Sequence, residues 1–450
     1  MANDIDPASD TGDKRDSSDS IDSSSFYEER VGTFSALRFG NFRLLLTVHM
    51  FAVAAQWIQQ LTINWLVYKM TGSGTILGTL NMVGTITSLG MIPLGGLLID
   101  RINHRRLLLM VVAWMLAITL GLGFILLSGH HQILYLFIFA GLSGLTLTVF
   151  INLRQVAVFD LVPRSITPSA VPMLLTGGGI MRSFGPAIGG FLMLWFGPAQ
   201  NFFLQAGAYT LIAVTIMQMR FPEREANKIQ TSPFQNIREG IRYVAKERIT
   251  RNFMLMGFVT PLFTVPIITI LPPIYVVKVY NGGPEILGML LAPVGIGGIF
   301  GGIFTASLSR FERRGLVQIS ALFLLALSLI AFGFTTIFWV ALPLLGLAGF
   351  FEGVFLTTNQ TLLMLSIPDE LRGRVISIVN LSGALAFLGG LVAGIGADRF
   401  GGPRLITIIL AGIAACISIF VLIFSSTIRN YRLSQGIAAK SESAAKDSAT

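Results

Sequence analysis

Charge is scarce in this chain. Only 12% of its 450 residues are Asp, Glu, Lys or Arg, whereas 53% are hydrophobic, and the mean hydropathy is +0.72. Soluble proteins carry about 25% charged residues. Half that share leaves too little polar surface to cover a water-exposed globule of this length. A large soluble enzyme is therefore excluded, and the surplus apolar residues are expected to face lipid.

Residues for metal and redox chemistry are also few. The one cysteine, Cys416, lies in an apolar run, which excludes a disulfide framework and a cysteine-based metal site. There are four histidines, two of them the adjacent His130 and His131, so a zinc site is not expected. We predict no metal, no cofactor and no catalytic residues. The first 25 residues are acidic and rich in serine, which is typical of a disordered tail rather than a signal peptide.

Long apolar runs bounded by charged or turn residues recur along the rest of the chain. Each is long enough for a membrane-spanning helix, which needs about 20 residues. They do not alternate between polar and apolar residues, so helices are expected rather than barrel strands. Twelve spans are predicted near residues 41–68, 75–99, 107–127, 133–153, 169–196, 198–219, 253–277, 286–308, 316–335, 338–366, 375–397 and 403–426.

The basic residues are distributed unevenly among the connections. Of the 32 Lys and Arg, 27 fall in the two tails and in the connections on the same side as the tails. Four fall on the other side, and Arg182 lies inside a span. This bias predicts that both termini are cytoplasmic. It also explains the net charge of +9 without nucleic acid, because no recognition module accompanies it.

The sequence repeats itself at an offset of 205 residues. Gln155 falls on Gln360 and Pro163 on Pro368, and several glycines match at the same offset. Two six-helix halves in the same orientation are typical of transporters. We therefore expect an all-α membrane protein with a tail at 1–35, helical halves at 36–220 and 253–428, a cytoplasmic linker at 221–252 and a tail at 429–450.

A loop motif follows the second predicted span. A glycine precedes an aspartate and a basic cluster, and the residues are Gly96, Asp100, Arg101, Arg105 and Arg106. The motif resembles the loop between the second and third helices of the major facilitator superfamily, where such residues latch the cytoplasmic side. Asn103 stands where the family usually has Gly, but Asn tolerates the left-handed turn. The alternative is ordinary positive-inside charge beside a chance glycine.

The fifth span carries a second motif, formed by Gly185, Pro186, Gly189 and Gly190. It resembles the Gly-Pro-x-x-Gly-Gly signature of the drug antiporters of that superfamily, although Met181 replaces a further glycine. Glycines four residues apart let two helices touch through their backbones, and the eighth span, with glycines in 295–302, is the expected partner. Alternatively, these glycines serve packing alone and carry no information about transport direction.

Three further segments narrow the resemblance: 41–43, 65–68 and 368–375 are similar to the bacterial branch that contains enterobactin exporters and macrolide efflux proteins. The resemblance implies a multi-pass, monomeric transporter of the inner or plasma membrane, not an enzyme. It implies proton-coupled efflux, by antiport, of an amphipathic organic molecule such as a siderophore or drug. An importer, a lipid or lysolipid transporter of the same fold, and a non-transporting receptor or scaffold remain alternatives.

One acidic residue, Glu352, lies in the middle of a span. An ionised carboxylate there costs about 2.5–3.5 kcal/mol, which suits a group that binds and releases a proton. Its repeat position is Leu147, so a symmetric structural role is not expected, and we predict that Glu352 couples transport to protons. The alternative is a fixed ion pair with Arg182. Arg182 itself is interpreted as a partner of Glu352 or of an anionic ligand, or as a packing residue.

Polar residues form a stripe on the first span. His49, Gln56, Gln60 and Asn64 fall within about 80° of one another on a helix. The resemblance implies that the first, fourth, seventh and tenth helices line the cavity, so Asn152 and Asn359 are expected to join the stripe there. Interhelical hydrogen bonding, worth about 0.6 kcal/mol per bond, is the alternative. Four prolines between 261 and 273 predict a kinked seventh span that can act as a gate.

Overall fold

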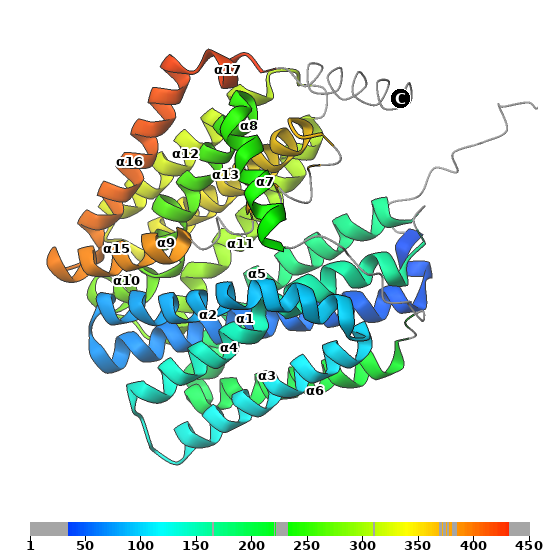
Figure 1. Ribbon diagram of the computed structural model, residues 1–450. Coiled ribbons are helices and arrows are strands. Elements are labelled where there is room, and N and C mark those ends of the chain that lie inside the picture. The colour runs from blue at the N-terminus through cyan, green and yellow to red at the C-terminus, as the bar shows by residue number, and fades with distance from the viewer. Residues whose placement is uncertain are drawn as a thin grey trace, which may run out of the picture.

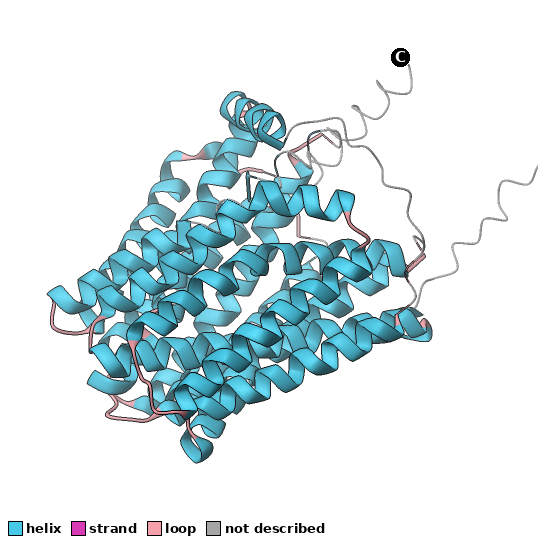
Figure 2. Ribbon diagram, turned by 60° about the horizontal axis from the view of Figure 1, so that its bottom comes forward, coloured by secondary structure: helices cyan, strands magenta, loops and turns pink. Residues whose placement is uncertain are grey.

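The structure is a computed structural model that describes residues 35–163, 166–219, 221, 233–308, 311–368, 371, 375, 378–379 and 385–431 (Figure 1). The side chains at 93, 97, 100, 159, 168 and 233–237 lie outside the description. The described part is helical throughout and contains no strand (Figure 2). This matches the predicted all-α fold.

Six long helices form the first half of the molecule, preceded by the short helix η1 (Ser35–Arg38). They are α1 (Gly40–Thr71), α2 (Gly74–Arg101), α3 (His104–Leu127), α4 (Ile133–Leu161), α5 (Thr167–Phe196) and α6 (Pro198–Gln218).

A separate short helix, α7 (Pro233–Lys246), leads into the second half. That half consists of α8 (Arg248–Val259), η2 (Thr260–Thr264), α9 (Val265–Thr269), α10 (Pro272–Lys278), α11 (Pro284–Ser307), α12 (Arg314–Phe334), α13 (Phe338–Leu365), α15 (Leu385–Arg399), α16 (Pro403–Phe424) and α17 (Ser426–Arg429).

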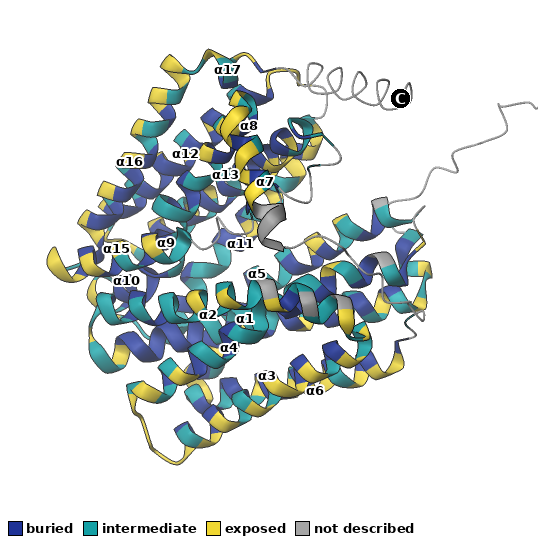
Figure 3. Ribbon diagram, in the orientation of Figure 1, coloured by how far each residue is buried: buried dark blue, intermediate teal, exposed yellow. Residues whose placement is uncertain are grey.

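Nine helical stretches in the described residues are long and apolar enough to cross a membrane. The stretch 248–278, made of α8, η2, α9 and α10, counts as one of them. The other three predicted spans correspond to α5, α6 and α15, which the structure contains as helices. Large apolar side chains on the outside of the bundle, among them Trp195, Trp339 and Phe420, are exposed, as lipid contact requires (Figure 3).

The two halves repeat the same helix boundaries. α4 begins at Ile133 and α13 at Phe338, which lie 205 residues apart, and α6 and α16 begin at Pro198 and Pro403 with the same offset. Because α6 and α16 both begin with proline in the first turn, where the missing N–H costs nothing, the matched prolines set the same start in each half.

The seventh predicted span is broken, as its prolines predict. It passes from α-helix through a π-helical turn at Thr260–Thr264, which begins beside Pro261, and then through α9 to α10. Proline has no N–H and cannot continue the hydrogen-bond ladder. The Thr260 side chain donates instead to the Gly257 carbonyl, at 3.4 Å.

Chain direction gives the bundle two distinct ends. The basic end contains the α2–α3 connection and the starts of α8 and α12, and the opposite end contains the α1–α2 and α15–α16 connections. At the opposite end, α2 and α15 touch through their backbones: a Cβ at Gly74 would lie 2.7 Å from the Gly394 carbonyl oxygen, and one at Gly78 2.9 Å from that of Gly390. Figure 1 shows the halves meeting there and diverging towards the basic end.

A second contact between the halves runs along α5 and α11. A Cβ at Gly190 would lie 2.5 Å from the Pro284 carbonyl oxygen, and one at Gly288 2.6 Å from that of Pro186. The expected pairing of the fifth and eighth spans is thus present. Gly185 and Gly189 face α1 instead, where their Cβ atoms would lie 3.2 Å from Trp57 and 3.3 Å from Ile58. The motif therefore joins α5 to two helices rather than to one.

Candidate transport site

The centre of the molecule holds an ion pair between the halves. Arg182 on α5 donates to both carboxylate oxygens of Glu352 on α13, at 3.4 and 3.3 Å. Glu352 is only 5% exposed, whereas the Arg182 side chain is 34% exposed. The guanidinium carbon of Arg182 also lies 5.2 Å from the centre of the Trp57 ring on α1, within cation–π range. Three helices thus converge on one buried carboxylate.

The sequence left two interpretations of Glu352: a group that couples transport to protons, or a member of a fixed ion pair with Arg182. The ion pair with Arg182 is present, and it joins α5 to α13 across the interface of the halves. A buried pair is costly to break by removing one partner, because the other charge remains in the interior. Protonation of Glu352 neutralises the carboxylate and weakens the pair. The Arg182 cation that remains is 34% exposed, so it is not fully buried, and the geometry is compatible with proton coupling.

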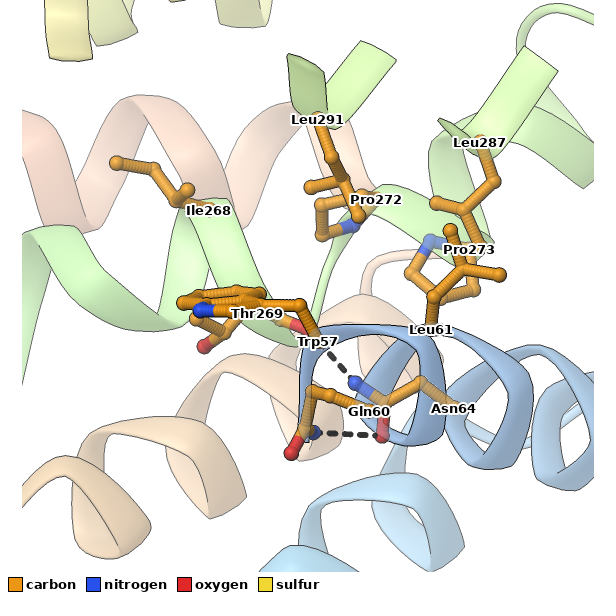
Figure 4. Close-up of a pocket in the computed structure, with 10 residues that line it drawn as sticks. All are labelled: Trp57, Gln60, Leu61, Asn64, Ile268, Thr269, Pro272, Pro273, Leu287 and Leu291. Atoms are coloured by element: carbon orange, nitrogen blue, oxygen red, sulfur yellow. Dashed lines mark hydrogen bonds between the residues drawn. The ribbon is translucent and has the colours of Figure 1, made fainter. Parts of the chain in front are cut away.

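A narrow pocket lies beside Trp57, between α1, α9, α10 and α11 (Figure 4). Its apolar wall comes from residues of both halves, and its lining consists of Trp57, Gln60, Leu61, Asn64, Ile268, Thr269, Pro272, Pro273, Leu287 and Leu291. The pocket combines an aromatic face with two amides.

The amides of the predicted stripe form a hydrogen-bond network. Gln60 donates to Asn64 at 3.1 Å and to Asn81 on α2 at 2.8 Å, and Asn81 donates to Asn64 at 3.1 Å. Asn64 in turn donates to the Thr269 carbonyl of α9, at 2.9 Å, which connects the two halves. Gln60 and Asn64 therefore both line the pocket and hold helices together.

The other predicted cavity residues are dispersed. His49 is half-buried and faces α5, where a Cβ at Gly178 would lie 2.8 Å from its Nε2. Gln56 and Asn152 are half-buried on α1 and α4. Asn359 is buried and accepts a hydrogen bond from Gln318 of α12, at 2.5 Å, so its amide is engaged within the second half.

The fourth predicted span ends at residue 153, which places Arg154 among the basic residues of a cytoplasmic connection, and this placement was wrong. The helix α4 continues to Leu161, and Arg154 is 6% exposed within it, with its guanidinium carbon 4.5 Å from the centre of the Phe150 ring. Its Nε and Nη1 atoms are buried and have no hydrogen-bond partner among the described residues. The predicted end of the fourth span at 153 concealed this buried cation.

Exposed polar side chains occur on the basic-end parts of spanning helices. Gln155 on α4 and Gln360 and Thr361 on α13 are exposed although their helices cross the membrane. Polar groups in spanning helices face water-filled openings rather than lipid. The matched pair Gln155 and Gln360 was visible in the repeat, but the sequence did not show that both are exposed.

The loop motif is tied to its surroundings on the side of α4 and α6. Arg105 donates to the Met217 carbonyl of α6, at 2.5 Å, while Arg101 and Arg106 are exposed. A Cβ at Gly96 would meet nothing within 4 Å, so close helix approach does not require this glycine. The side chain of Asp100 lies outside the described residues.

A histidine within this motif contacts an acidic residue of α4. His104 Nδ1 lies 2.7 Å from Asp160 Oδ2 on α4, and its Nε2 lies 3.2 Å from the Ile99 carbonyl oxygen. His104 therefore joins the start of α3 to the end of α4, a contact that the sequence pattern did not predict.

The opposite end is held by a carboxylate from the other half. Asp398 at the end of α15 accepts hydrogen bonds from Ser73 Oγ and the backbone N–H of Gly74, both at 2.7 Å, and from the N–H of Thr75, at 2.8 Å. These groups form the start of α2, where unpaired N–H groups attract negative charge. We refer to this arrangement as the Asp398 clasp.

The hydrogen bonds of the clasp also set the charge state of its carboxylate. Partial burial acts to raise the pKa of Asp398, but the hydrogen bonds from Ser73, Thr75 and Gly74 outweigh it, and the pKa lies below its ordinary value of 3.8. Asp398 is therefore ionised near neutral pH.

In the described residues, no three His, Cys, Asp or Glu side chains gather as a metal site would require.

Comparison with known proteins identifies the family. A model of the family described as transmembrane secretion effector matches residues 31–446. The chain belongs to this family of major facilitator superfamily transporters. Its members are membrane transporters and not enzymes.

Similar curated proteins are transporters of several kinds. The chain is 27% identical to the staphyloferrin A transporter of Staphylococcus aureus, over 78% of this chain and 88% of that protein. It is 24% identical to the multidrug efflux pump Tap of Mycolicibacterium fortuitum, over 80% and 90%. It is 23% identical to the enterobactin exporter of Shigella boydii, over 73% and 79%.

Solved structures of the same fold agree with the helical arrangement. The D-xylose–proton symporter superposes with a TM-score of 0.68 at 14% identity, covering 89% of this chain and all of that one. A bacterial homologue of the human lysosomal transporter Spinster, in an inward-facing and unoccupied conformation, superposes with a TM-score of 0.66 at 14% identity, covering 87% and 98%. At this identity the likeness concerns the fold alone.

Proposed function

We propose that this transporter exports an amphipathic organic molecule, such as a siderophore or drug, in exchange for protons. The relatives named for efflux or export support this direction. The observation that carries the proton coupling is the Arg182–Glu352 pair, which places one buried carboxylate at the interface of the two halves.

The conformation of the structure fits one stage of an alternating-access cycle. The halves touch at the opposite end through Gly74, Gly78 and the Asp398 clasp. Exposed polar residues mark an opening towards the basic end. We assign the basic end to the cytoplasm, following the distribution of positive charge, and the membrane to the bacterial inner or plasma membrane. In this assignment the structure is open to the cytoplasm.

The ion pair gives the proton a defined effect. While Glu352 is ionised, it holds Arg182 beside Trp57 and joins α5 to α13. A ligand that stacks on Trp57 and contacts the amides of the narrow pocket binds while this ion pair is intact. When Glu352 takes up a proton, the attraction to Arg182 is lost and the arrangement around Trp57 loosens. Ligand and proton then bind in alternation, which is the requirement for antiport.

The partly exposed guanidinium of Arg182 favours a second possibility. A ligand anion that binds Arg182 would replace Glu352 as its partner and leave that carboxylate easier to protonate. Ligand and proton would then bind together, and the protein would be a symporter, as an importer of this fold requires. The two cycles therefore differ in the sign of the ligand effect on proton binding.

Purified protein in detergent distinguishes them. We would add staphyloferrin A, enterobactin and a macrolide in turn to a weakly buffered sample and follow proton release with a pH-sensitive dye. Antiport predicts proton release on binding, and symport predicts uptake. Glu352→Gln should abolish either signal while ligand binding, measured by quenching of tryptophan fluorescence, persists.

A control variant separates Glu352 from acids in general. Glu285 is an acidic residue at the opposite end that accepts a hydrogen bond from the Gly283 N–H of its own segment, at 3.2 Å. Glu285→Gln should leave the proton signal unchanged. A full proton signal in Glu352→Gln would remove Glu352 from the coupling mechanism.

A further inference from the structure

The helix α7 and the start of α8 expose five cations at the basic end. Arg238, Arg242 and Lys246 are exposed on α7, and Arg248 and Arg251 are exposed in the first turn of α8. Residues four apart share one face of a helix, so the three cations of α7 form a single stripe. We call these five residues the α7–α8 basic patch.

The other face of α7 is fixed to the protein. Val244 is buried, and the Tyr243 hydroxyl donates to the Ser366 carbonyl just beyond α13, at 3.3 Å. Burial raises the pKa of Tyr243 despite its contact with Thr250, so the hydroxyl keeps its proton. The stripe is thus held outward by packing and is not a face that turns freely.

The position of the patch relative to the bilayer follows from the chain. Only Glu247 separates α7 from α8, and the stretch beginning at Arg248 is one of the membrane spans. Figure 1 shows α7 running across the direction of the spanning helices rather than along it. The Arg251 side chain donates to the Ala245 carbonyl at the end of α7, at 2.9 Å, which holds the two helices together at this corner.

Exposed apolar residues adjoin these cations. Ile241 is 53% exposed between Arg238 and Arg242, and Leu255 is 55% exposed one turn beyond Arg251, on the same face of α8. Leu255 lies within a membrane span, so Arg251, one turn nearer the basic end, sits close to the depth of the lipid headgroups. A soluble acidic partner gains nothing from Ile241 and Leu255, whereas a lipid surface offers both phosphate and acyl chain.

We propose that the α7–α8 basic patch binds the phosphate groups of anionic phospholipids in the leaflet at the basic end. Each Lys or Arg close to an anionic surface contributes about 1 kcal/mol, or about fivefold in affinity. The patch would anchor α7, and with it the connection between the two halves, to the membrane surface. This inference does not depend on which molecule is transported.

The full chain in detergent provides the test. Phosphatidylglycerol or phosphatidylcholine in mixed micelles is added at low salt, and bound lipid is counted by native mass spectrometry. Phosphatidylglycerol should bind preferentially, and Arg242→Gln/Lys246→Gln should weaken it about 25-fold, at about fivefold per cation. The control Lys69→Gln/Lys278→Gln removes two exposed cations at the opposite end and should bind as the parent does.

Three results would overturn the proposal. One is an equal affinity of the parent for the two lipids, and another is an equal loss in the patch and control variants. The third concerns residues 1–34, whose acidic character also complements the patch. If the full chain does not bind phosphatidylglycerol but a chain without residues 2–30 does, the patch binds that segment and not lipid.

Discussion

Asp398→Asn tests how the opposite end of the transporter stays closed. The parent carboxylate accepts three hydrogen bonds from Ser73, Gly74 and Thr75 of the other half, at 2.7, 2.7 and 2.8 Å. An asparagine side chain offers one oxygen and turns an NH2 group towards remaining donors. It also removes the negative charge from the start of α2. The variant should therefore favour the conformation that is open at this end.

The size of the effect follows from the kind of bond. Hydrogen bonds to a charged group contribute about 1.5–3 kcal/mol. Asp398 is exposed, and solvent screening reduces the contribution of such groups. We therefore expect a net change of about 1–2 kcal/mol, which shifts the ratio of the two conformations about five- to thirtyfold.

A distance measurement between the halves reports this ratio. Cys416→Ser removes the native thiol, and spin labels at His131→Cys and Thr336→Cys place one label on an exposed loop of each half at the opposite end. Pulsed electron paramagnetic resonance should show one short distance in the parent and a larger population of a longer distance in Asp398→Asn. Identical distributions would refute the role of the clasp.

The clasp also has a defined pH dependence. Burial raises the pKa of Asp398, but the hydrogen bonds lower it further, to a net value below 3.8. A carboxylate with a lowered pKa stabilises the closed state above its ordinary pKa, and this stabilisation is lost as the pH falls through the lowered value. In Glu352→Gln, in which the proposed coupling group cannot take up a proton, the distance distribution should thus remain constant from about pH 8 to about pH 5. Glu285→Gln is the matched control for Asp398→Asn. Glu285 bonds within its own half, so its replacement should leave the distances between the halves unchanged.

Three other changes test the packing and the network. Gly288→Leu should lower the unfolding temperature by several degrees, because the Cβ at this position would lie 2.6 Å from a carbonyl oxygen of α5 and overpacking costs about 1–3 kcal/mol. The control Gly302→Leu should leave the unfolding temperature unchanged, because its Cβ meets nothing within 4 Å. A double-mutant cycle of His104→Ala and Asp160→Ala, read by thermal unfolding, should give a coupling of about 1–2 kcal/mol, and additive effects would contradict the pairing. Asn64→Leu should change the ratio of the two conformations, read with the same spin labels, by about threefold or less, since neutral bonds in membranes are worth about 0.6 kcal/mol.

Apolar runs and charge determined the general architecture from sequence alone. A bilayer forces every backbone polar group to be paired within the segment, so long apolar stretches had to be helices. Each expected span overlaps a helix of the structure, and nine stretches among the described residues are long and apolar enough to cross a membrane. The prolines of the seventh span likewise predicted its break, since the missing N–H acts locally.

The sequence also indicated which residues were unusual without showing how they meet. Glu352 and Arg182 were both recognised as charges at membrane depth, and their pairing was one of two interpretations. Their separation of 170 residues carries no information about distance in space. Conversely, Arg154 was assigned to a connection because a charged residue was taken as the end of a span, although α4 continues to Leu161 and buries it.

The contacts between the halves depended on tertiary structure alone. Asp398 lies in a short segment after the eleventh predicted span, where nothing marks it as different from other charged loop residues. Its three hydrogen bonds arise because α15 and α2 pack so closely at Gly394 and Gly74 that its carboxylate meets the start of α2. A sequence fixes which residues prefer lipid, water or a turn, because these preferences are local. Which distant helices touch depends on how whole surfaces fit together.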